Sequence, residues 1–518
     1  MRRSWTSLLV AATVLGSVAW INHIPYRPHV LGRAVPADAV WVSRHQRVAE
    51  RWSDLTGSWL TPVAAQMIGM PGLRARAWLD SPTTRAWVQE FGEQEVWLFT
   101  FPDERNGMAL GACAWIGGRS WRWRWALARS QRDGIRAMGN HRGRTIWAWT
   151  PPDHDRELRG TLALAVEEGV LLACWSEDPS AIVKLLDAYD GLTPRHVEAR
   201  RLVQNAASDV AVARLNWANQ ATDIQAEWES AHGRVRGRLL LRPARLPDEK
   251  FAEVPSELPN GVRWIQARAV AYAWVAPEWV LSEVPLPWRQ RLGEVLERVR
   301  AVSEPPWLIA FHDAPLNGRL RGLRVPGLTV SMRLRGGVNW SNEVASLLDR
   351  INSREPWGCV GAPLPGVPGV VALEFTGKAL WRGAPLSECI AWAEDGGWVT
   401  LANSAQVLQM LKFAGPAPAI EEPRTLPARI HARFVIHVPR AMEAVRLALD
   451  VVGLLRLIED PAGSAEVRFQ YERWREMLAP WTVMSRLHGD LVRSDDGVLV
   501  YFEAFTNPAE FPAACLER

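Results

Sequence analysis

A unit of strand, tight turn, strand and helix occurs twice in this chain, and this repetition constrains the fold most strongly. The first copy, Leu162–Asp187, reads LALAVEEGVLLACWSEDPSAIVKLLD, and the second, Cys389–Lys412, reads CIAWAEDGGWVTLANSAQVLQMLK. Acidic residues followed by glycine between two apolar runs are typical of hairpins. Asp178 before Pro179 is a helix N-cap signal, and Asn403 opens a stretch with capping-box spacing. The sequence therefore predicts one module of sheet and helix that is used twice.

Further segments return in the same order around these two units. The pattern predicts a turn followed by a strand at Val35–Val42, matched by Leu258–Ile265. It predicts further matched strands at Val96–Pro102 and Trp307–Asp313, Trp121–Leu127 and Leu328–Leu334, and Thr145–Trp149 and Gly369–Phe375. The pairs His232-Gly233 and His488-Gly489 are interpreted as strand-entry turns near the end of each copy. The spacing between matched segments varies, as expected when two copies differ in loop length.

The predicted fold class is α+β, with an N-terminal transmembrane helix followed by two copies of an antiparallel-sheet module with helices packed on one face. The predicted boundaries are 1–29 for a signal anchor and linker, 30–241 for the first module, 242–256 for a linker and 257–518 for the second module. The linker 242–256 reads RPARLPDEKFAEVPS, which is rich in proline and charge.

The amino-terminal residues predict a location for the protein. Arg2 and Arg3 precede an uncharged stretch from Ser4 to Ile24, which is long enough for one membrane-spanning helix. We interpret it as an uncleaved signal anchor of the inner membrane that exports the rest of the chain to the periplasm. A cleaved secretory signal and a buried N-terminal helix are the alternatives. The residues predicted to anchor the chain are Leu8, Leu9, Val10, Val14, Leu15, Val18, Trp20 and Ile21.

Composition excludes several classes of protein. With 48% hydrophobic and 22% charged residues, the chain is not a disordered protein. The five cysteines are scattered and form no C-x-x-C pair, so neither a disulfide scaffold nor a zinc module is indicated. The 29 tryptophans and the strong preference for arginine over lysine are attributed to a GC-rich coding sequence rather than to a binding role.

Signatures of catalysis were sought and none was found. The chain contains no phosphate-binding G-x-x-x-x-G-K-[ST] loop, no dinucleotide-binding G-x-G-x-x-G and no G-x-S-x-G nucleophile elbow. Its eleven histidines never occur as H-E-x-x-H or H-x-H. We therefore predict no catalytic residue, no cofactor and no metal site.

The most distinctive local sequence is WRWRW at Trp121–Trp125. Its alternation predicts a half-buried strand with three indoles on one face and two guanidiniums on the other. Guanidinium groups bind phosphate and carboxylate with two parallel hydrogen bonds, so the arginines here are a candidate patch for lipid headgroups or an acidic partner. Nucleic acid would use the same chemistry, but an exported domain rarely meets it. The predicted patch consists of Arg119, Arg122, Arg124, Arg129 and Arg132.

The turn-strand opening Pro36-Ala37-Asp38-Ala39, the repeated hairpin-helix unit and the N-terminal anchor together resemble a class of bacterial envelope proteins. Those proteins are membrane-anchored, internally duplicated and of unknown function. The resemblance covers most of residues 30–505 and implies an exported α+β protein, without carrying over any catalytic residue.

The predicted function is that of a non-enzymatic scaffold or binding protein of the bacterial envelope, with an envelope protein or lipid as its partner and no nucleic acid. No oligomeric state is predicted. One alternative is a carrier of lipid or another hydrophobic ligand, with a cavity between sheet and helices. A second alternative is an enzyme whose site is assembled from residues distant in the sequence.

Overall fold

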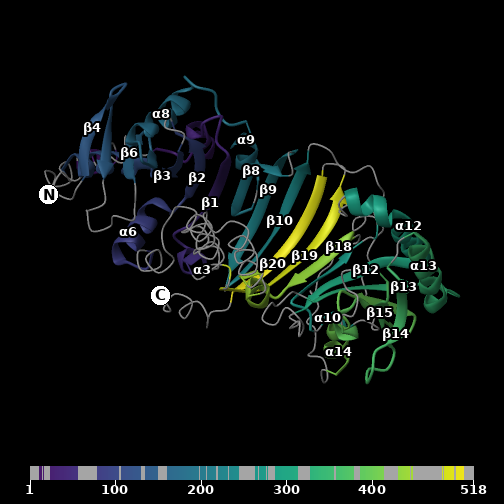
Figure 1. The fold of residues 1–518 in the computed structure, drawn as a ribbon. Coiled ribbons are helices and arrows are strands. Elements are labelled where there is room, and N and C mark those ends of the chain that lie inside the picture. Colours follow the sequence, from purple (N-terminus) through teal and green to yellow (C-terminus); the bar gives the residue numbers. More distant parts are fainter. Residues whose placement is uncertain are drawn as a thin grey trace, which may run out of the picture. The chain divides into compact units, whose positions relative to one another are not determined.

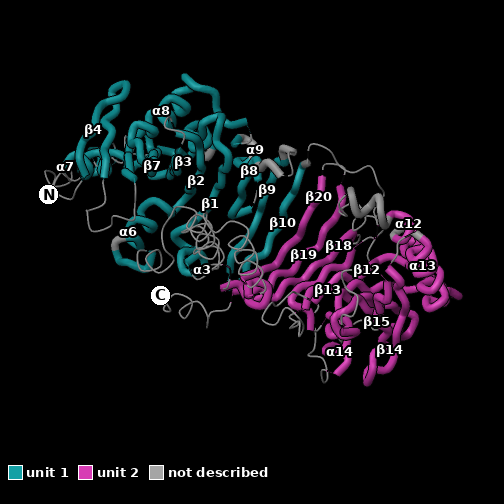
Figure 2. Tube along the Cα trace, viewed as in Figure 1, with its two compact units in different colours: residues 1–244, 518 teal, residues 245–517 magenta. Residues whose placement is uncertain are grey.

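The computed structural model divides into two compact units (Figure 2). Unit 1 comprises residues 1–244 together with residue 518, and unit 2 comprises residues 245–517. The structure describes residues 11–14, 16, 24–56, 79–103, 107–129, 135–149, 160–197, 199–205, 207–217, 220–231, 233–243, 263–266, 268–275, 277, 286–312, 327–354, 357–377, 385–413, 430–443, 445–446, 481, 483–494 and 497–506.

The ten strands described in unit 1 form an antiparallel sheet (Figure 1). Their spatial order is β4–β5–β6–β7–β3–β2–β1–β8–β9–β10. Their bounds are β1 (Trp41–Gln46), β2 (Glu95–Pro102), β3 (Met108–Trp115), β4 (Ile135–His141), β5 (Arg144–Trp149), β6 (Thr161–Glu167), β7 (Val170–Ser176), β8 (Asp209–Trp217), β9 (Gln220–Ala231) and β10 (Arg234–Pro243).

The ten strands described in unit 2 follow the order β14–β15–β16–β17–β13–β12–β11–β18–β19–β20, again antiparallel throughout. Each strand of unit 1 thus has a counterpart numbered ten higher, and unit 2 repeats the topology of unit 1. The bounds are β11 (Ala271–Val275), β12 (Ser303–His312), β13 (Gly327–Leu334), β14 (Cys359–Pro363), β15 (Val370–Phe375), β16 (Ala391–Asp395), β17 (Trp398–Ala402), β18 (Ala432–Ile436), β19 (Met484–Ser494) and β20 (Gly497–Thr506).

The helices occupy matching places between these strands. In unit 1 they are α2 (Pro28–Leu31), α3 (Trp52–Thr56), α6 (Pro82–Phe91), α7 (Ser120–Arg129), α8 (Ile182–Asp190) and α9 (Ala199–Gln204). In unit 2 they are α10 (Arg263–Gln266), α12 (Leu286–Val302), α13 (Trp340–Arg354) and α14 (Ala405–Phe413). Short 3-10 turns are η1 (Gly32–Ala34), η2 (Gly117–Arg119), η5 (Pro179–Ala181) and η7 (Leu386–Glu388). By their order in the chain, α7 corresponds to α13, and α8 corresponds to α14.

Helices cover both faces of the sheet in unit 1 (Figure 1). Ala163 and Ala165 of β6 pack with Ile182 of α8, whereas the alternating residue Leu164 packs with Leu127 of α7. Successive side chains of a strand point to opposite faces, so α8 and α7 lie on opposite sides of the sheet. In unit 2, α14 and the pair α12 and α13 likewise belong to separate core clusters on alternating residues of β15.

The predicted fold class is therefore wrong. Among the described residues of each unit, more lie in strands than in helices, and helices cover two faces of each sheet instead of one. A membrane-spanning helix needs about 20 consecutive, mostly apolar residues, and no helix of that kind was found among the described residues. Of the predicted anchor residues, Val14 is described and is 55% exposed. The others lie outside the described residues: Leu8, Leu9, Val10, Leu15, Val18, Trp20 and Ile21.

Three local predictions are also wrong, and one strand was not predicted at all. The segment Trp121–Leu127 belongs to helix α7 rather than to a strand, and the predicted opening strand near Ile265 is the short helix α10. The strand β3 was missed because its sequence, MALGACAW, is rich in small residues with low strand propensity. His488 and Gly489 lie in the middle of β19, whereas the turn between β9 and β10 is at Gly233.

Candidate functional site

Helix α7 presents two tryptophans to solvent. Trp121 and Trp125 are 58% and 55% exposed, and their spacing of four residues places them on one face of the helix. The guanidinium of Arg129, one turn further on, lies 3.5 Å above the ring of Trp125. The opposite face of the helix carries the buried Leu127 and the partly buried Trp123, which pack against the sheet. The indoles of WRWRW are thus divided between core and solvent.

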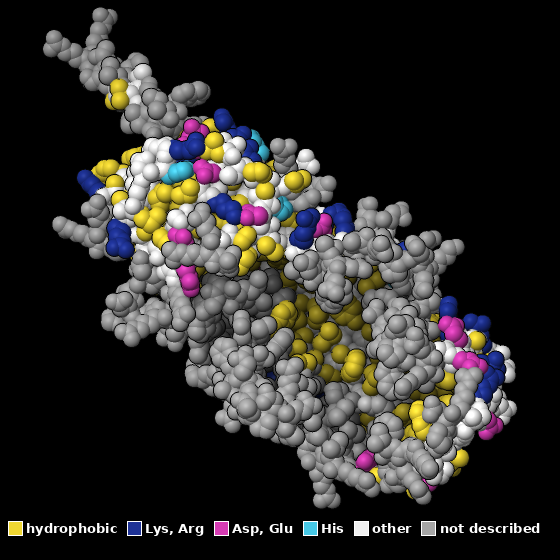
Figure 3. All heavy atoms as spheres, turned by 45° about the horizontal axis from the view of Figure 1, so that its top comes forward, with side chains coloured by type: hydrophobic (Ala, Val, Ile, Leu, Met, Phe, Trp, Pro, Cys, Tyr) yellow, Lys and Arg dark blue, Asp and Glu magenta, His cyan; other side chains and the backbone are white. Residues whose placement is uncertain are grey.

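Most arginines of the predicted patch are paired within unit 1. The ion pairs are Arg119 with Glu93 at 3.0 Å, Arg122 with Glu90, and Arg124 with Glu167 at 3.5 Å. Arg129 is stacked on an indole, and Arg132 lies outside the described residues. On the face of the molecule shown in Figure 3, Lys and Arg side chains lie beside Asp and Glu side chains rather than forming a field of one sign. The carboxylates come from α6, its C-terminal turn and β6, which a reading of the local sequence around α7 did not include.

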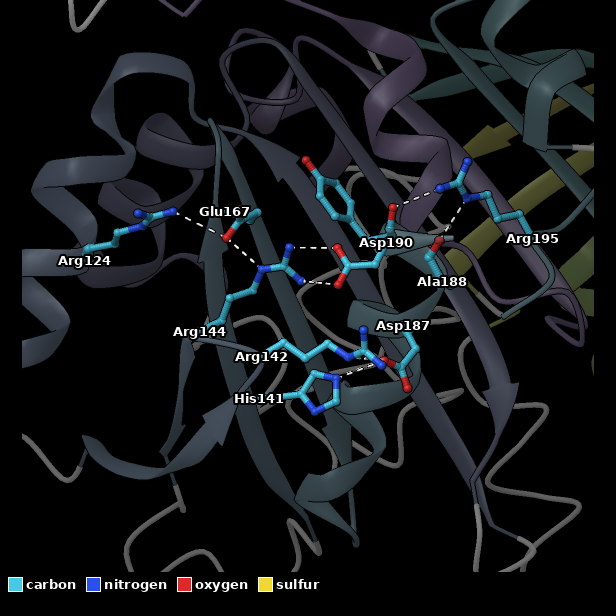
Figure 4. Close-up of polar contacts among 10 residues, drawn as sticks. Arg124, His141, Arg142, Arg144, Glu167, Asp187, Ala188, Asp190 and Arg195 are labelled. Carbon is cyan, nitrogen blue, oxygen red and sulfur yellow. Dashed lines mark hydrogen bonds and ion pairs between the residues drawn. The ribbon is translucent and has the colours of Figure 1, made fainter. Parts of the chain in front are cut away.

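The contacts of Glu167 extend from Arg124 of α7 into a wider charged network, which joins the β4–β5 hairpin to helix α8 (Figure 4). Arg144 donates to Glu167 at 2.9 Å and to both oxygens of Asp190 at 2.8 and 2.7 Å. This bidentate contact with Arg144 holds the pKa of Asp190 below its ordinary value. His141 contacts Asp187 at 2.9 Å in the same network. The charges satisfy one another, so we interpret this network as a structural connection.

The described residues offer no reactive thiol and no metal cluster. Cys113, Cys174, Cys359 and Cys389 are buried and free of disulfides, and burial raises the pKa of the Cys174 thiol to about 12. No group of three or more His, Cys, Asp or Glu side chains in the described part of the chain is arranged to hold a metal ion.

A serine, a histidine and an aspartate do meet on the sheet of unit 1. His45 contacts the Ser43 hydroxyl through Nε2 at 2.9 Å and Asp209 through Nδ1 at 2.9 Å. These atoms follow the connectivity of a Ser-His-Asp catalytic triad. Ser43 and His45 are two residues apart on β1, and Asp209 is opposite His45 on β8. Sequence reading missed this cluster because 164 residues separate His45 from Asp209, and only the pairing of β1 with β8 brings them together.

The serine of this cluster is closed to a substrate. Ser43 and Asp209 are fully buried, the Ser43 hydroxyl also donates to the Leu98 carbonyl at 3.3 Å, and Arg51 binds both oxygens of Asp209 at 2.5 and 3.0 Å. A nucleophile needs access and a position for the reacting carbonyl group. We therefore interpret the cluster as a buried polar network that joins β1 to β8, and not as an active site.

The pH dependence of unit 1 tests this interpretation. Burial opposes ionisation of Asp209, but hydrogen bonds from His45 and Arg51 outweigh it and hold the pKa of this carboxyl below its ordinary value. The unfolded chain therefore takes up the proton first, and this contribution to stability is lost as the pH falls below about 4. We expect the stability difference between the wild type and Asp209→Asn to be largest near neutral pH and to shrink as the pH falls below about 4.

The measurement is the hydrogen-exchange protection of peptides from β1 and β8, compared between the two proteins at a series of acidic pH values. The control is Asp395→Asn, at an exposed hairpin tip of unit 2, which should leave the profile unchanged because water solvates that carboxylate in both states. A difference for Asp209→Asn that stays constant down to the lowest pH would contradict a charged Asp209 in the network.

The exposed face of α7 is thus the candidate functional site among the described residues. It consists of two solvent-facing indoles on one helix face, with arginines beside them. Comparisons with models of protein families, with curated proteins and with solved structures each found no match.

Proposed function

We propose that this protein binds an anionic membrane surface through the exposed face of helix α7, in a binding role and not a catalytic one. The observation that carries the proposal is the pair Trp121 and Trp125, each more than half exposed and flanked by Arg122 and Arg129. Tryptophan favours the boundary between lipid headgroups and acyl chains. A basic residue near an anionic membrane contributes about 1 kcal/mol to binding.

Unit 2 provides an internal comparison for this helix. Its counterpart α13 begins with Trp340, which is 2% exposed and packs in the core. The exposed positions of α13 include Ser341, Asn342 and Ser346, with no aromatic residue among its exposed side chains that the structure describes. The same topology therefore forms without solvent-facing tryptophans at this place. Exposed indoles on α7 are not a requirement of the fold, and this favours a role in binding.

The chemistry of the α7 face favours a lipid surface over an acidic protein. A helix that lies in the interface presents aromatic side chains to the acyl boundary and basic side chains to the headgroups. Trp121, Trp125 and Arg129 follow one another at four-residue intervals along one face. Arg122 lies next to Trp121 and is also exposed. Both parts of an interfacial helix are therefore present on α7.

Replacing both Trp121 and Trp125 by alanine should weaken binding to anionic vesicles. Burial of apolar surface contributes about 25 cal/mol per Å², so the loss of two half-exposed indoles should lower the partition coefficient at least roughly tenfold. The measurement is co-sedimentation of the full chain with vesicles of phosphatidylglycerol mixed with phosphatidylcholine, compared with phosphatidylcholine alone.

The matched control is Phe413→Ala, which removes an aromatic side chain of 63% exposure from α14 of unit 2. It should leave vesicle binding unchanged. A wild-type protein that does not sediment with the anionic vesicles would refute the proposal. So would equal losses in the control and in the double variant, because binding would then not depend on α7.

The predicted export of the chain, its predicted role as an envelope scaffold and a predicted partner in the envelope are compatible with a protein that binds a membrane surface. The alternative of a hydrophobic-ligand carrier would require lipid to co-purify with the protein after its release from membranes.

A further inference from the structure

The carboxylate of Glu90 occupies the centre of the basic groups beside the α7 face. Its Oε1 accepts a hydrogen bond from Arg122 and one from the indole Nε1 of Trp123 at 3.1 Å. The Nε of Arg119 lies 3.9 Å from the same oxygen. Three donors of two adjacent elements, η2 and α7, are thus gathered around one oxygen that comes from the last turn of α6.

We propose that Glu90 is an internal counterion of the α7 face, which the phosphate group of an anionic lipid displaces when the helix meets the membrane. This inference rests on the proposed function of α7. The donors that hold Glu90 are also suited to a phosphate diester, because guanidinium and indole N–H groups can donate to carboxylate and to phosphate oxygens. Glu90 thereby sets how strongly the helix binds the membrane.

The exposure of the groups makes this exchange feasible. The side chain of Arg122 is 55% exposed and that of Glu90 is 22% exposed. An ion pair so close to water is worth little by itself, so a phosphate at high local density on a membrane competes with it at small cost. Trp121, next to Arg122 in the chain, brings the same part of α7 to the headgroups.

Replacing Glu90 by glutamine should therefore strengthen binding to the phosphatidylglycerol vesicles. Freeing one basic group near the surface is worth about 1 kcal/mol, which corresponds to roughly a fivefold rise in the partition coefficient. The matched control is Glu229→Gln, which also removes one negative charge from unit 1 but pairs with Arg236 of β10. General electrostatics predict the same small effect for both variants, whereas the proposal predicts a gain for Glu90→Gln alone.

A double-variant cycle with Arg122→Gln tests the mechanism. Arg122→Gln should cost more binding in the Glu90→Gln background than in the wild type, since Glu90 no longer neutralises it there. Near-ultraviolet circular dichroism checks that Glu90→Gln keeps its tertiary structure. If that variant does not fold, Glu90→Asp replaces it, because a carboxylate shorter by one methylene should release Arg122 and raise binding as well.

The outcomes separate this inference from the proposed function. If the wild type does not bind the vesicles, the proposed function fails and this inference fails with it. If the wild type binds and loses binding in Trp121→Ala with Trp125→Ala, but Glu90→Gln behaves like Glu229→Gln, the inference alone is overturned. Equal costs of Arg122→Gln in both backgrounds would also overturn it.

Discussion

Replacing Asp490 by alanine should destabilise unit 2 by about 3–5 kcal/mol, because the partner charge is left buried without its counterion. The guanidinium Nε of Arg433 donates to Asp490 Oδ1 at 2.7 Å, and the two side chains are 3% and 11% exposed. Arg433 lies directly opposite Asp490 in the pairing of β18 with β19. The pair is therefore held by the register of two neighbouring strands, each of which is itself paired on its other side, and neither charge can move to water without opening the sheet.

Hydrogen exchange of peptides from β18 and β19 measures this effect within unit 2. A single unfolding curve of the whole chain would not separate the stability of unit 2 from that of unit 1. The control is Asp223→Ala in unit 1, whose partner Arg214 is at 2.8 Å with both side chains more than half exposed. An exposed pair of this kind is worth about 0–1 kcal/mol. Replacing both members of the buried pair, Arg433→Met with Asp490→Leu, should recover most of the stability, since no charge then remains buried. Equal protection in Asp490→Ala and wild type would contradict the argument.

Each unit has a buried arginine in the same pair of neighbouring strands, which is β1 with β8 in unit 1 and β11 with β18 in unit 2. The arginine lies on the first strand of the pair in unit 1 and on the second strand in unit 2. In unit 1, Arg44 of β1 is paired with Val210 of β8. In unit 2, Trp274 of β11 is paired with Arg433 of β18. Arg44 and Trp274 are each almost fully buried. The matching topology thus tolerates the cation on either of the two neighbouring strands, with an apolar residue opposite it, although the polar partners of the two arginines differ.

Short-range signals in the sequence predicted the hairpin-helix units correctly. The turn between β6 and β7 uses Glu168 and Gly169 with positive φ angles of 25° and 86°, and Asp178 caps the 3-10 turn that leads into α8. Acidic residues before glycine identify such a turn because glycine adopts the left-handed conformation without steric cost. The turn between β16 and β17 follows the same rule at Gly396 and Gly397. The conformation of these turns and of the helix cap is set by residues that are adjacent in the chain.

Elements that depend on distant contacts were not predictable in this way. The missed strand β3 contains Gly111, where a Cβ atom would lie 2.2 Å from the ring of Phe99 on β2. Small residues in β3 thus make room for the aromatic side chains of its neighbour, and they weaken the strand signal as a result. The alternation of WRWRW was too short to outweigh the helix-favouring residues that follow it. Helix α7 contacts the core through Leu127, which packs on β6.

The candidate site shows the same limit. The arginines of α7 were identifiable from sequence, but their counterions were not, because Glu90 and Glu167 lie 32 and 43 residues away from Arg122 and Arg124 in the chain. A spacing of four residues between Trp121 and Trp125 does carry a signal. It is the spacing of one helix face, and it could have favoured a helix with an exposed aromatic face over a strand.

Replacing Arg44 by methionine should destabilise unit 1 by about 3 kcal/mol, because three partly buried carbonyl groups lose their donors and a buried acceptor without a donor costs about 1–3 kcal/mol. Arg44 is 1% exposed. It donates to the carbonyls of Val203 at 3.2 Å, Asn205 at 2.6 Å and Ala207 at 2.8 Å. Two of these groups lie at or just beyond the C-terminal end of α9, where helix carbonyls have no partner of their own and a cation is favourable.

Hydrogen exchange of peptides from α9 and β8 is the measurement, and Arg236→Met is the control because Arg236 is 67% exposed and pairs with an exposed glutamate. The control should change protection little. Arg44→Lys should fall between methionine and wild type, since an ammonium presents its donors from a single atom and cannot span three carbonyls as a guanidinium does. Full protection in Arg44→Met would show that the three carbonyls find other partners.

The arrangement of unit 2 can be transferred to unit 1 by combining Arg44→Trp with Val210→Arg. The new arginine would lie opposite Glu227 of β9, as Arg433 lies opposite Asp490. This exchange restores a buried cation beside a carboxylate, but it leaves the carbonyls at the end of α9 without a donor. We therefore expect the double variant to remain about as unstable as Arg44→Met. Recovery to wild-type protection would mean that the cation matters in unit 1 for its charge, as in unit 2, and not for the end of the helix.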